Sequence, residues 1–255
     1  MAKAGREVVR KALPAIKDKY APDFILGNAE NLAGGRGVNE KTLTEMWDAG
    51  FHGFTSGNHI WDNKEVLSIL REEDRVFRPA NYPDSKLEKT PGRGYGILSN
   101  GTKEIFIINL MGQVFMQDVE CPFKEVDRII SENTSDAPIF LDLHAETTSE
   151  KSAMGWYLDG RISAMVGTHT HVQTADNRIL PKGTAFITDV GMNGAFDSCI
   201  GIDKTAIIKK FVTKRRAQFQ PSRDNPGVAF VVITIGDDNR ATSIERERYE
   251  VQLDD

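Results

Sequence analysis

The segment PIFLDLHAETTSEKSAMGWYLDGRISAMVGTHTH, residues 138–171, decides the fold. It begins with an apolar run at 138–143, continues through a helical stretch at 149–158, and ends with a second apolar run at 162–167. Short apolar runs separated by a helix predict a strand–helix–strand unit with parallel strands. Polar side chains follow both runs, and the carboxyl ends of parallel strands meet at one edge of a sheet, where ligands bind.

The same alternation extends in both directions along the chain. Two hairpins interrupt it, at Asn100-Gly101 and at Gly236–Asn239, because turn residues there join pairs of apolar runs. The other predicted elements are helices at 5–20, 39–49, from about 62, 122–133 and 203–211, and strands at 23–27, 51–56 and 185–188. Strands alternating with helices, together with hairpins, predict a layered α/β architecture with mixed sheets.

Composition excludes several classes of protein. The chain has 255 residues, 40% of them hydrophobic, and shows no internal repeat or domain boundary, so we expect one domain over residues 1–255. A net charge of -5 argues against bulk attraction to nucleic acid or to an anionic membrane. The two cysteines form no disulfide framework, and no apolar run is long enough to span a membrane. We therefore expect a cytoplasmic protein without a membrane partner.

The polar residues that follow the predicted strands are the candidates for chemistry. They are Asn28, Glu30, Asn31, Asn58, His59, Asp142, His144, His169 and His171. In an extended backbone, residues two apart project to the same side, so we expect His169 and His171 to place both imidazoles on one metal ion. The alternative is a pair of surface or hydrogen-bonded histidines.

The oxygen donors in this set are suited to a pair of metal ions. Glu30 can bridge two ions, and Asn31 and Asn58 can supply amide oxygens, although asparagine beside glycine is also a common turn residue. Nitrogen and oxygen ligands without thiolate favour Mn, Fe or Zn. Two such ions activate water and clamp the oxygens of a phosphoester, so phosphoester hydrolysis is the natural use.

His59 directly follows a candidate ligand, which suits a general acid that protonates a departing oxygen. The alternative is an ordinary half-buried histidine. Asp62 can orient His59, but it can equally cap the helix predicted to begin there. The basic residues at 209–216 can attract phosphate, although a solvated helix end explains them better. No phosphate-binding P-loop motif is present.

Five motifs in this order make the chain similar to a known family. They are Gly27-Asn28-Ala29-Glu30-Asn31, Gly57-Asn58-His59, Asp142 to Glu146, Gly167 to Asp176 and Thr188 to Met192. Together they resemble the bacterial YmdB-type branch of the calcineurin-like metallophosphoesterases, over essentially the whole chain. The resemblance implies a four-layer α/β/β/α sandwich with two mixed sheets, a dinuclear metal centre, and phosphodiesterase activity towards 2′,3′-cyclic nucleotides and related phosphodiesters.

The resemblance also assigns roles to individual residues. Glu30 matches the bridging ligand, Asn31 and Asn58 match the amide ligands, and His59 matches the general acid. The imidazole ligands are matched by His144, His169 and His171. The chain differs from the wider superfamily at two positions, where Glu30 replaces Asp and Ile60 replaces an acidic residue. Both differences look typical of this branch.

One departure concerns the beginning of the chain. Members of this branch begin with an apolar strand ending in Gly-Asp-Val, whose Asp binds the first metal, and a Gly-Arg then opens the first helix. Gly5-Arg6 matches that Gly-Arg, whereas Met1 to Ala4 cannot supply the strand or the Asp. We expect this strand and ligand to be missing and the first metal to bind poorly. A start codon assigned too far downstream explains this better than a functional short form, because losing a central strand costs more than a domain's net stability.

The expected reaction is attack of a metal-bridging hydroxide on phosphorus, with His59 protonating the leaving ribose oxygen. The substrates expected are small phosphodiesters or cyclic nucleotides, with RNA ends as a further class, and a homo-oligomer is left open. The alternative function is a regulatory phosphate- or nucleotide-binding protein with impaired catalysis. An amidohydrolase site also uses a His-x-His pair, but there the motif belongs to the first strand, whereas His169 and His171 lie late in the chain.

Overall fold

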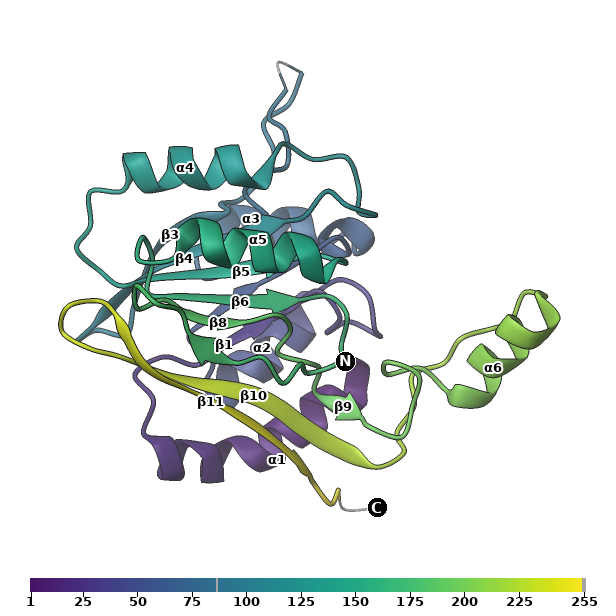
Figure 1. Ribbon diagram of the computed structural model, residues 1–255. Coiled ribbons are helices and arrows are strands. Elements are labelled where there is room, and N and C mark those ends of the chain that lie inside the picture. Colours follow the sequence, from purple (N-terminus) through teal and green to yellow (C-terminus); the bar gives the residue numbers. More distant parts are fainter. Residues whose placement is uncertain (86, 254–255) are drawn as a thin grey trace.

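The computed structural model describes residues 1–85 and 87–253, and these form four layers (Figure 1). Helices α4 (Pro122–Glu132) and α5 (Thr148–Leu158) cover the outer face of a six-stranded sheet. Helices α1 (Ala2–Tyr20) and α2 (Glu40–Ala49) cover the opposite side of the molecule, where α1 packs on strand β10. The predicted layered α/β fold is confirmed.

The six-stranded sheet has the strand order β3-β4-β5-β6-β8-β7. Its strands are β3 (Tyr95–Ser99), β4 (Glu104–Met111), β5 (Ile139–His144), β6 (Ala164–Thr168), β7 (Arg178–Ile179) and β8 (Ala185–Ile187). Strands β4, β5, β6 and β8 run parallel, and β3 and β7 pair antiparallel at the two edges. The hairpin expected at Asn100-Gly101 is the β3–β4 pair. The central strands are buried on both faces, which explains their nearly continuous apolar runs.

The second layer of strands is divided into two small sheets. One is the parallel pair β1 (Leu26–Asn28) and β2 (Gly53–Thr55), and the other is antiparallel. The antiparallel sheet contains β9 (Gly194–Ala195), β10 (Pro226–Ile235) and β11 (Ala241–Glu250). Its long β10–β11 hairpin packs against β7 and β8 of the six-stranded sheet.

A cavity of about 750 Å³ lies between the two small sheets and the six-stranded sheet. Its walls include Leu26 and Phe54 from one small sheet, residues 228–236 from β10, and Phe140 and Val166 from the six-stranded sheet. Within the described residues, β1 pairs only with β2, and β10 pairs with β9 only at Pro226 and Gly227. The cavity is therefore mainly apolar, with polar residues such as Glu30 and His171 at one end, and it is flanked by strand edges that pair with no other described strand.

The region after β2 differs from the prediction. A 3₁₀ turn occupies Ile60–Asp62, and helix α3 begins only at Val66 and ends at Glu72, with no side-chain cap at its N-terminus. The capping role considered for Asp62 is therefore wrong, because its carboxylate is bound to His59 instead. The remaining helix, α6 (Lys204–Thr213), is capped by the side chain of Asp203. No described helix has the length and apolar character that spanning a bilayer requires.

Candidate metal centre

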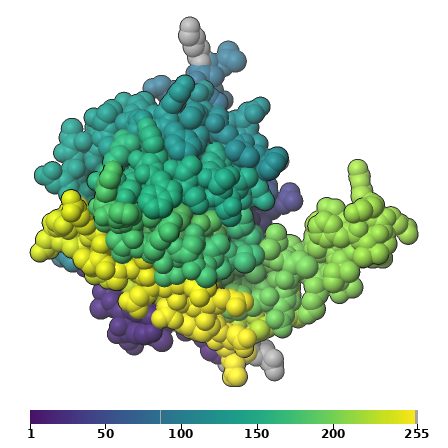
Figure 2. Space-filling view, in the orientation of Figure 1, coloured from purple at the N-terminus to yellow at the C-terminus, as the bar shows by residue number. Residues whose placement is uncertain are grey.

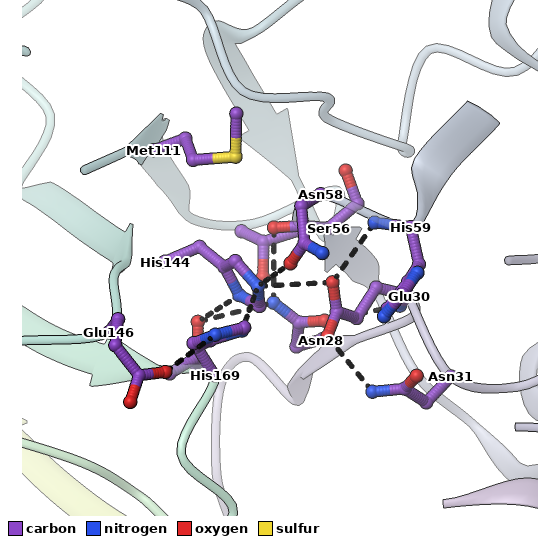
Figure 3. A network of polar contacts seen from close by, with 12 residues as sticks. Asn28, Glu30, Asn31, Ser56, Asn58, His59, Met111, His144, Glu146 and His169 are labelled. Carbon is purple, nitrogen blue, oxygen red and sulfur yellow. Dashed lines mark hydrogen bonds and ion pairs between the residues drawn. The ribbon is translucent and has the colours of Figure 1, made fainter. Parts of the chain in front are cut away.

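The candidate site lies at the carboxyl ends of β1, β2, β5 and β6 (Figure 3). His144 is the last residue of β5, and Thr168 opposite it is the last residue of β6, so His169 emerges beside His144. Asn28 pairs with Thr55 at the ends of β1 and β2, and Glu30 and Asn58 follow within a few residues. This is the convergence at strand ends that the sequence predicted.

Glu30, His144 and His169 form the centre of the site. Their ligand atoms all lie within 4.8 Å of one another, and Glu30 and His144 are buried. His144 Nε2 lies 3.0 Å from Glu30 Oε2 and 3.0 Å from His169 Nδ1. It is also 2.9 Å from Asn58 Oδ1. One ring nitrogen carries a single proton or lone pair and cannot satisfy three such partners, whereas a cation between them would.

The position of the proton on His144 also favours a cation between Glu30, His144 and His169. The hydroxyl of Thr168 donates to Asp142 Oδ1 at 2.8 Å, so its oxygen accepts from His144 Nδ1 at 2.9 Å. Because Nδ1 carries the proton, the lone pair of the neutral ring is on Nε2, which faces Glu30. A hydrogen bond that fixes the tautomer in this way is typical of histidines that bind metals.

Asn31 and His171 lie on the other side of Glu30. Asn31 Nδ2 is 2.9 Å from Glu30 Oε1 and 3.1 Å from His171 Nε2. The two carboxylate oxygens of Glu30 therefore face different groups, with Oε2 towards His144 and Oε1 towards Asn31. Glu30 therefore lies between two groups of polar side chains, of which Glu30, His144 and His169 form a candidate metal-binding cluster.

The backbone at His169 and His171 is not extended, so the geometric reason for expecting both rings on one ion is wrong. Strand β6 ends at Thr168, and the φ angles of His169 and His171 are 101° and 65°, in the left-handed region. The turn forms because Asp189 Oδ2 accepts hydrogen bonds from the backbone N–H and the hydroxyl of Thr170. As a result His169 approaches Glu146, and His171 Nδ1 contacts the carbonyl oxygen of Ile200.

His59 lies at the rim of the site rather than in its centre. Its Nδ1 is 2.8 Å from Asp62 Oδ2, so the orienting role considered for Asp62 agrees with the geometry. Its backbone N–H donates to Glu30 Oε2 at 3.4 Å. The side chain is 28% exposed and can therefore meet a ligand that enters from solvent.

The sequence placed Asp142 among the candidates without a role, and it assigned no role to Glu146 or to the threonines that support the site. Asp142 is fully buried and accepts hydrogen bonds from Thr55, Thr168 and Asn28, and burial raises the pKa of its carboxyl. Glu146 Oε2 lies 3.0 Å from His169 Nε2. Glu146 could have been suspected because it follows the candidate ligand His144 by two residues. Thr55 and Thr168 could not, because a threonine within a strand is common and suggests no function.

The protonation states suit metal binding. Burial opposes ionisation of Glu30, but the neighbouring imidazoles of His144, His59 and His169 outweigh it and lower the pKa of Glu30 to about 2. Burial and the neighbouring His144 lower the pKa of His169 to about 4, and burial also lowers the pKa of His171. At neutral pH the Glu30 carboxylate is ionised and the rings of His169 and His171 are neutral, which are the forms that bind metal ions.

Comparison with known proteins agrees with the motifs and the geometry. The model of the family described as YmdB-like protein matches residues 1–247. The chain belongs to this family. Among YmdB-like relatives, the 2′,3′-cyclic-nucleotide 2′-phosphodiesterase of Bacillus subtilis (strain 168) is 46% identical over 95% of this chain and 91% of its own length. The resemblance inferred from the five motifs is therefore confirmed.

Two solved structures show how closely the fold of this YmdB-like chain is shared. A protein described as a novel phosphatase from Mycoplasma pneumoniae matches with a TM-score of 0.92 at 34% identity, covering 98% of this chain and 90% of that one. A hypothetical protein from Thermus thermophilus matches with a TM-score of 0.90 at 38% identity, covering 98% and 96% of the two chains. The expected fold class is confirmed by these matches.

Proposed function

We propose that this protein is a metal-dependent phosphodiesterase that hydrolyses 2′,3′-cyclic nucleotides or related phosphodiesters. The family and the name of its Bacillus subtilis relative support the reaction class. The observation that carries the proposal is the approach of His144 Nε2 to Glu30 Oε2 and His169 Nδ1, at 3.0 Å each. A phosphate- or nucleotide-binding protein without catalysis would not need His59 held at the rim of this cluster.

Two divalent ions would be held on the two sides of Glu30. His144 and His169 lie with Glu30 in one cluster, and Asn58 contacts His144. Asn31 contacts Glu30 Oε1 and, through the same amide nitrogen, His171. We favour Mn or Fe, with Zn as a third candidate, because the donors are imidazoles, amides and a carboxylate. Such ions lower the pKa of water and neutralise charge on phosphate oxygens.

His59 would act as the general acid. Asp62 holds its Nδ1, so Nε2 is the nitrogen from which a proton can pass to the departing ribose oxygen. The ring stands at the rim, outside the cluster of Glu30, His144 and His169, so it can touch substrate without being a ligand.

We also propose that the cavity beside β1 and β10 receives an additional apolar strand. A strand in this position would pair with both free edges and join the two small sheets. The cavity reaches Asn28, Glu30 and His171, so an acidic residue at the end of that strand would lie beside the proposed metal positions.

The test measures hydrolysis of 2′,3′-cyclic AMP with Mn supplied, for residues 1–255 and for a longer chain that begins with an apolar strand ending in Gly-Asp. We expect greater turnover and higher metal content in the longer chain.

In that chain, His59→Ala should lower kcat by roughly 10²- to 10⁴-fold and leave metal content unchanged. His52→Asn is the matched control, because His52 lies outside the site and bonds the backbone of Ile25. Absence of phosphodiester turnover in both chains with Mn or Fe would show that the protein is not this enzyme.

A further inference from the structure

An aromatic pair, Trp61 and Tyr82, flanks the candidate metal centre. The two ring centroids are 5.4 Å apart and the ring planes meet at 76°, which is an edge-to-face contact. Each residue packs against the apolar core that contains Phe54 and Val66, but both remain partly exposed. Neither ring is a candidate metal ligand, so the pair offers aromatic surface beside the ligands without competing for the ions.

Trp61 belongs to the turn that carries His59. The 3₁₀ turn Ile60–Asp62 directly follows His59, and the backbone N–H of Asp62 donates to the carbonyl of His59 at 3.1 Å. Residues three apart eclipse each other in such a turn, so the Asp62 side chain returns to the His59 ring. Trp61 lies one position earlier and points to another side of the turn, where it meets Tyr82. The indole is therefore fixed in position relative to His59.

Tyr82 approaches the centre from strand β4. Its hydroxyl lies 4.0 Å from Sδ of Met111, the last residue of β4, and Met111 pairs with His144 across β4 and β5. Burial raises the pKa of Tyr82 to about 12, and the negative charge of Glu30 acts in the same direction. The phenol therefore keeps its proton at neutral pH, and it donates to Gln117 Oε1 at 3.1 Å. The ring stands uncharged between the end of β4 and the turn that follows His59.

The position of Tyr82 is set by the preceding residue, Asn81, which is 1% exposed. Its Oδ1 accepts a hydrogen bond from the backbone N–H of Met111 at 2.9 Å. Its Nδ2 donates to the carbonyl oxygens of Met111 and Glu120 at 2.7 and 2.8 Å. A buried amide with three such bonds ties the chain at Tyr82 to the end of β4.

Arg78 closes the base of the same loop. Its side chain is largely buried, and its guanidinium donates to the carbonyl oxygens of residues 79, 80, 90 and 91. Residues 83–85 and 87–90 project from the body of the molecule (Figures 1 and 2), whereas Tyr82 lies at the anchored base of this projection. The aromatic pair is therefore pre-organised, and a ligand that binds to it does not have to order the loop first.

The reaction proposed above brings a nucleobase to this side of the centre. In a 2′,3′-cyclic nucleotide the base is attached to C1′ of the ribose, which is separated by only one or two bonds from the carbon that carries the departing oxygen. If His59 protonates that oxygen, the ribose lies against His59 and the base lies within reach of Trp61. Aromatic side chains bind any base by stacking, because every base has a π-face. This step rests on the proposed function.

We propose that Trp61 is the residue on which the base of a nucleotide substrate stacks, and that Tyr82 is a positioning residue that holds the indole in place through their edge-to-face contact. The pair carries no charge, so it suits a base rather than a further phosphate group. Small phosphodiesters without a base reach the metal centre but gain nothing from the pair. The protein therefore distinguishes nucleotides from other phosphodiesters mainly through KM.

Hydrolysis of two substrates with Mn, by whichever chain shows the greater turnover, tests the proposal. One is 2′,3′-cyclic AMP, and the other is ethylene glycol cyclic phosphate, which has the same five-membered cyclic phosphodiester but no base. Trp61→Leu should raise KM for cyclic AMP about 10- to 100-fold and change kcat/KM for the base-free substrate by less than about twofold. Trp61→Phe retains a ring for stacking and should raise KM for cyclic AMP by less than about threefold.

The matched control is Trp156→Leu, because Trp156 is 52% exposed on α5 and should affect neither substrate. Tyr82→Leu removes the ring that holds the indole and should raise KM for cyclic AMP alone, whereas Tyr82→Phe should restore it. Circular dichroism checks that each variant is folded. An unchanged KM for cyclic AMP in Trp61→Leu would overturn the proposal, and so would an equal loss on the two substrates.

Nucleotide binding without turnover separates this proposal from the proposed activity. Adenosine 3′-monophosphate, which has no phosphodiester to hydrolyse, is titrated with Mn into residues 1–255, and tryptophan fluorescence is excited beyond the absorption band of adenine. We expect quenching that is lost in Trp61→Phe and retained in Trp156→Phe. Quenching that requires Trp61 in a protein without turnover would support the base subsite although the proposed activity had failed. Absence of quenching, or quenching that persists in Trp61→Phe, would overturn the base subsite whatever the activity.

Discussion

The ammonium group of Lys151 lies 2.9 Å from Oδ2 of Asp189, and both side chains are almost completely buried. The same carboxylate oxygen accepts two hydrogen bonds from Thr170, and Oδ1 accepts one from the backbone N–H of Gly191. The ion pair therefore lies directly beneath the turn that carries His169 and His171. A helix on one side of the sheet thus fixes the position of two candidate ligands on its edge.

Lys151→Met should lower the free energy of unfolding by about 3–5 kcal/mol, because it leaves the buried carboxylate of Asp189 without its partner. Urea unfolding of the metal-free protein measures this. Lys103→Met is the control: it removes an ion pair with Asp23 in which both side chains are more than half exposed, and should cost less than about 1 kcal/mol. Equal losses in the two variants would mean that the buried pair has no special role.

Asp62→Asn should reduce kcat for 2′,3′-cyclic AMP by roughly 10- to 100-fold, the worth of a hydrogen bond between charged partners. The side chain acts through His59, so KM and metal content should change little. A nitrophenyl phosphodiester provides the discriminating measurement, because its leaving group departs without a proton. Activity on that substrate should be nearly unchanged, and an equal loss on both substrates would assign Asp62 a purely structural role.

Much of this site follows from the sequence because each element supplies its own local signal. The apolar runs at 139–143 and 162–167 predict the strands whose ends carry His144 and His169, and the Asn100-Gly101 pair predicts the β3–β4 hairpin. Since parallel strands end at one edge, the convergence of these residues with Glu30 and Asn58 could be predicted as well.

The structural features that could not be predicted depend on hydrogen-bond partners that lie far away in the sequence or that the local sequence does not identify. The turn at His169 to His171 is set by Asp189, which follows Thr170 by 19 residues and carries no pattern that reveals its target. The tautomer of His144 depends on Thr168 and Asp142, which meet only when β5 and β6 pair. The helix expected from Asp62 does not begin there, because the carboxylate binds His59.

The metal-free protein should lose stability as pH falls below neutrality. His169 has a folded pKa of about 4 against an ordinary value of 6.5, so between these values the unfolded chain binds the extra proton and unfolding becomes easier. Glu30 has a folded pKa of about 2 against 4.5, so its stabilising contribution is present above 4.5 and is lost as pH falls towards 2. Both titrations therefore lower the free energy of unfolding as the pH falls.

Urea unfolding in the presence of a chelator, at about pH 7 and about pH 5, measures the effect of His169. The free energy of unfolding should be lower at the more acidic pH, and His169→Gln should reduce the difference. Stability that is unchanged or higher at the acidic pH would contradict the proposed burial of a neutral imidazole beside His144.

Gly57→Ala should abolish metal binding, although the backbone at this position is not in the left-handed region. A Cβ atom on Gly57 would lie 2.2 Å from His144 Nε2 and 2.3 Å from Glu30 Oε2, so it would occupy the space between the two donors. The glycine before Asn58 is therefore required by the metal centre itself rather than by the turn.

Isothermal titration of the Gly57→Ala variant with Mn should show no binding. Gly236→Ala in the β10–β11 hairpin is the matched control and should bind Mn normally. Its Cβ would come closest to the flexible side chain of Asp238, at 3.2 Å, and would meet Thr242 and the Arg240 carbonyl only at 3.5 and 3.7 Å. Normal Mn binding by both variants would show that the ions do not lie between Glu30 and His144.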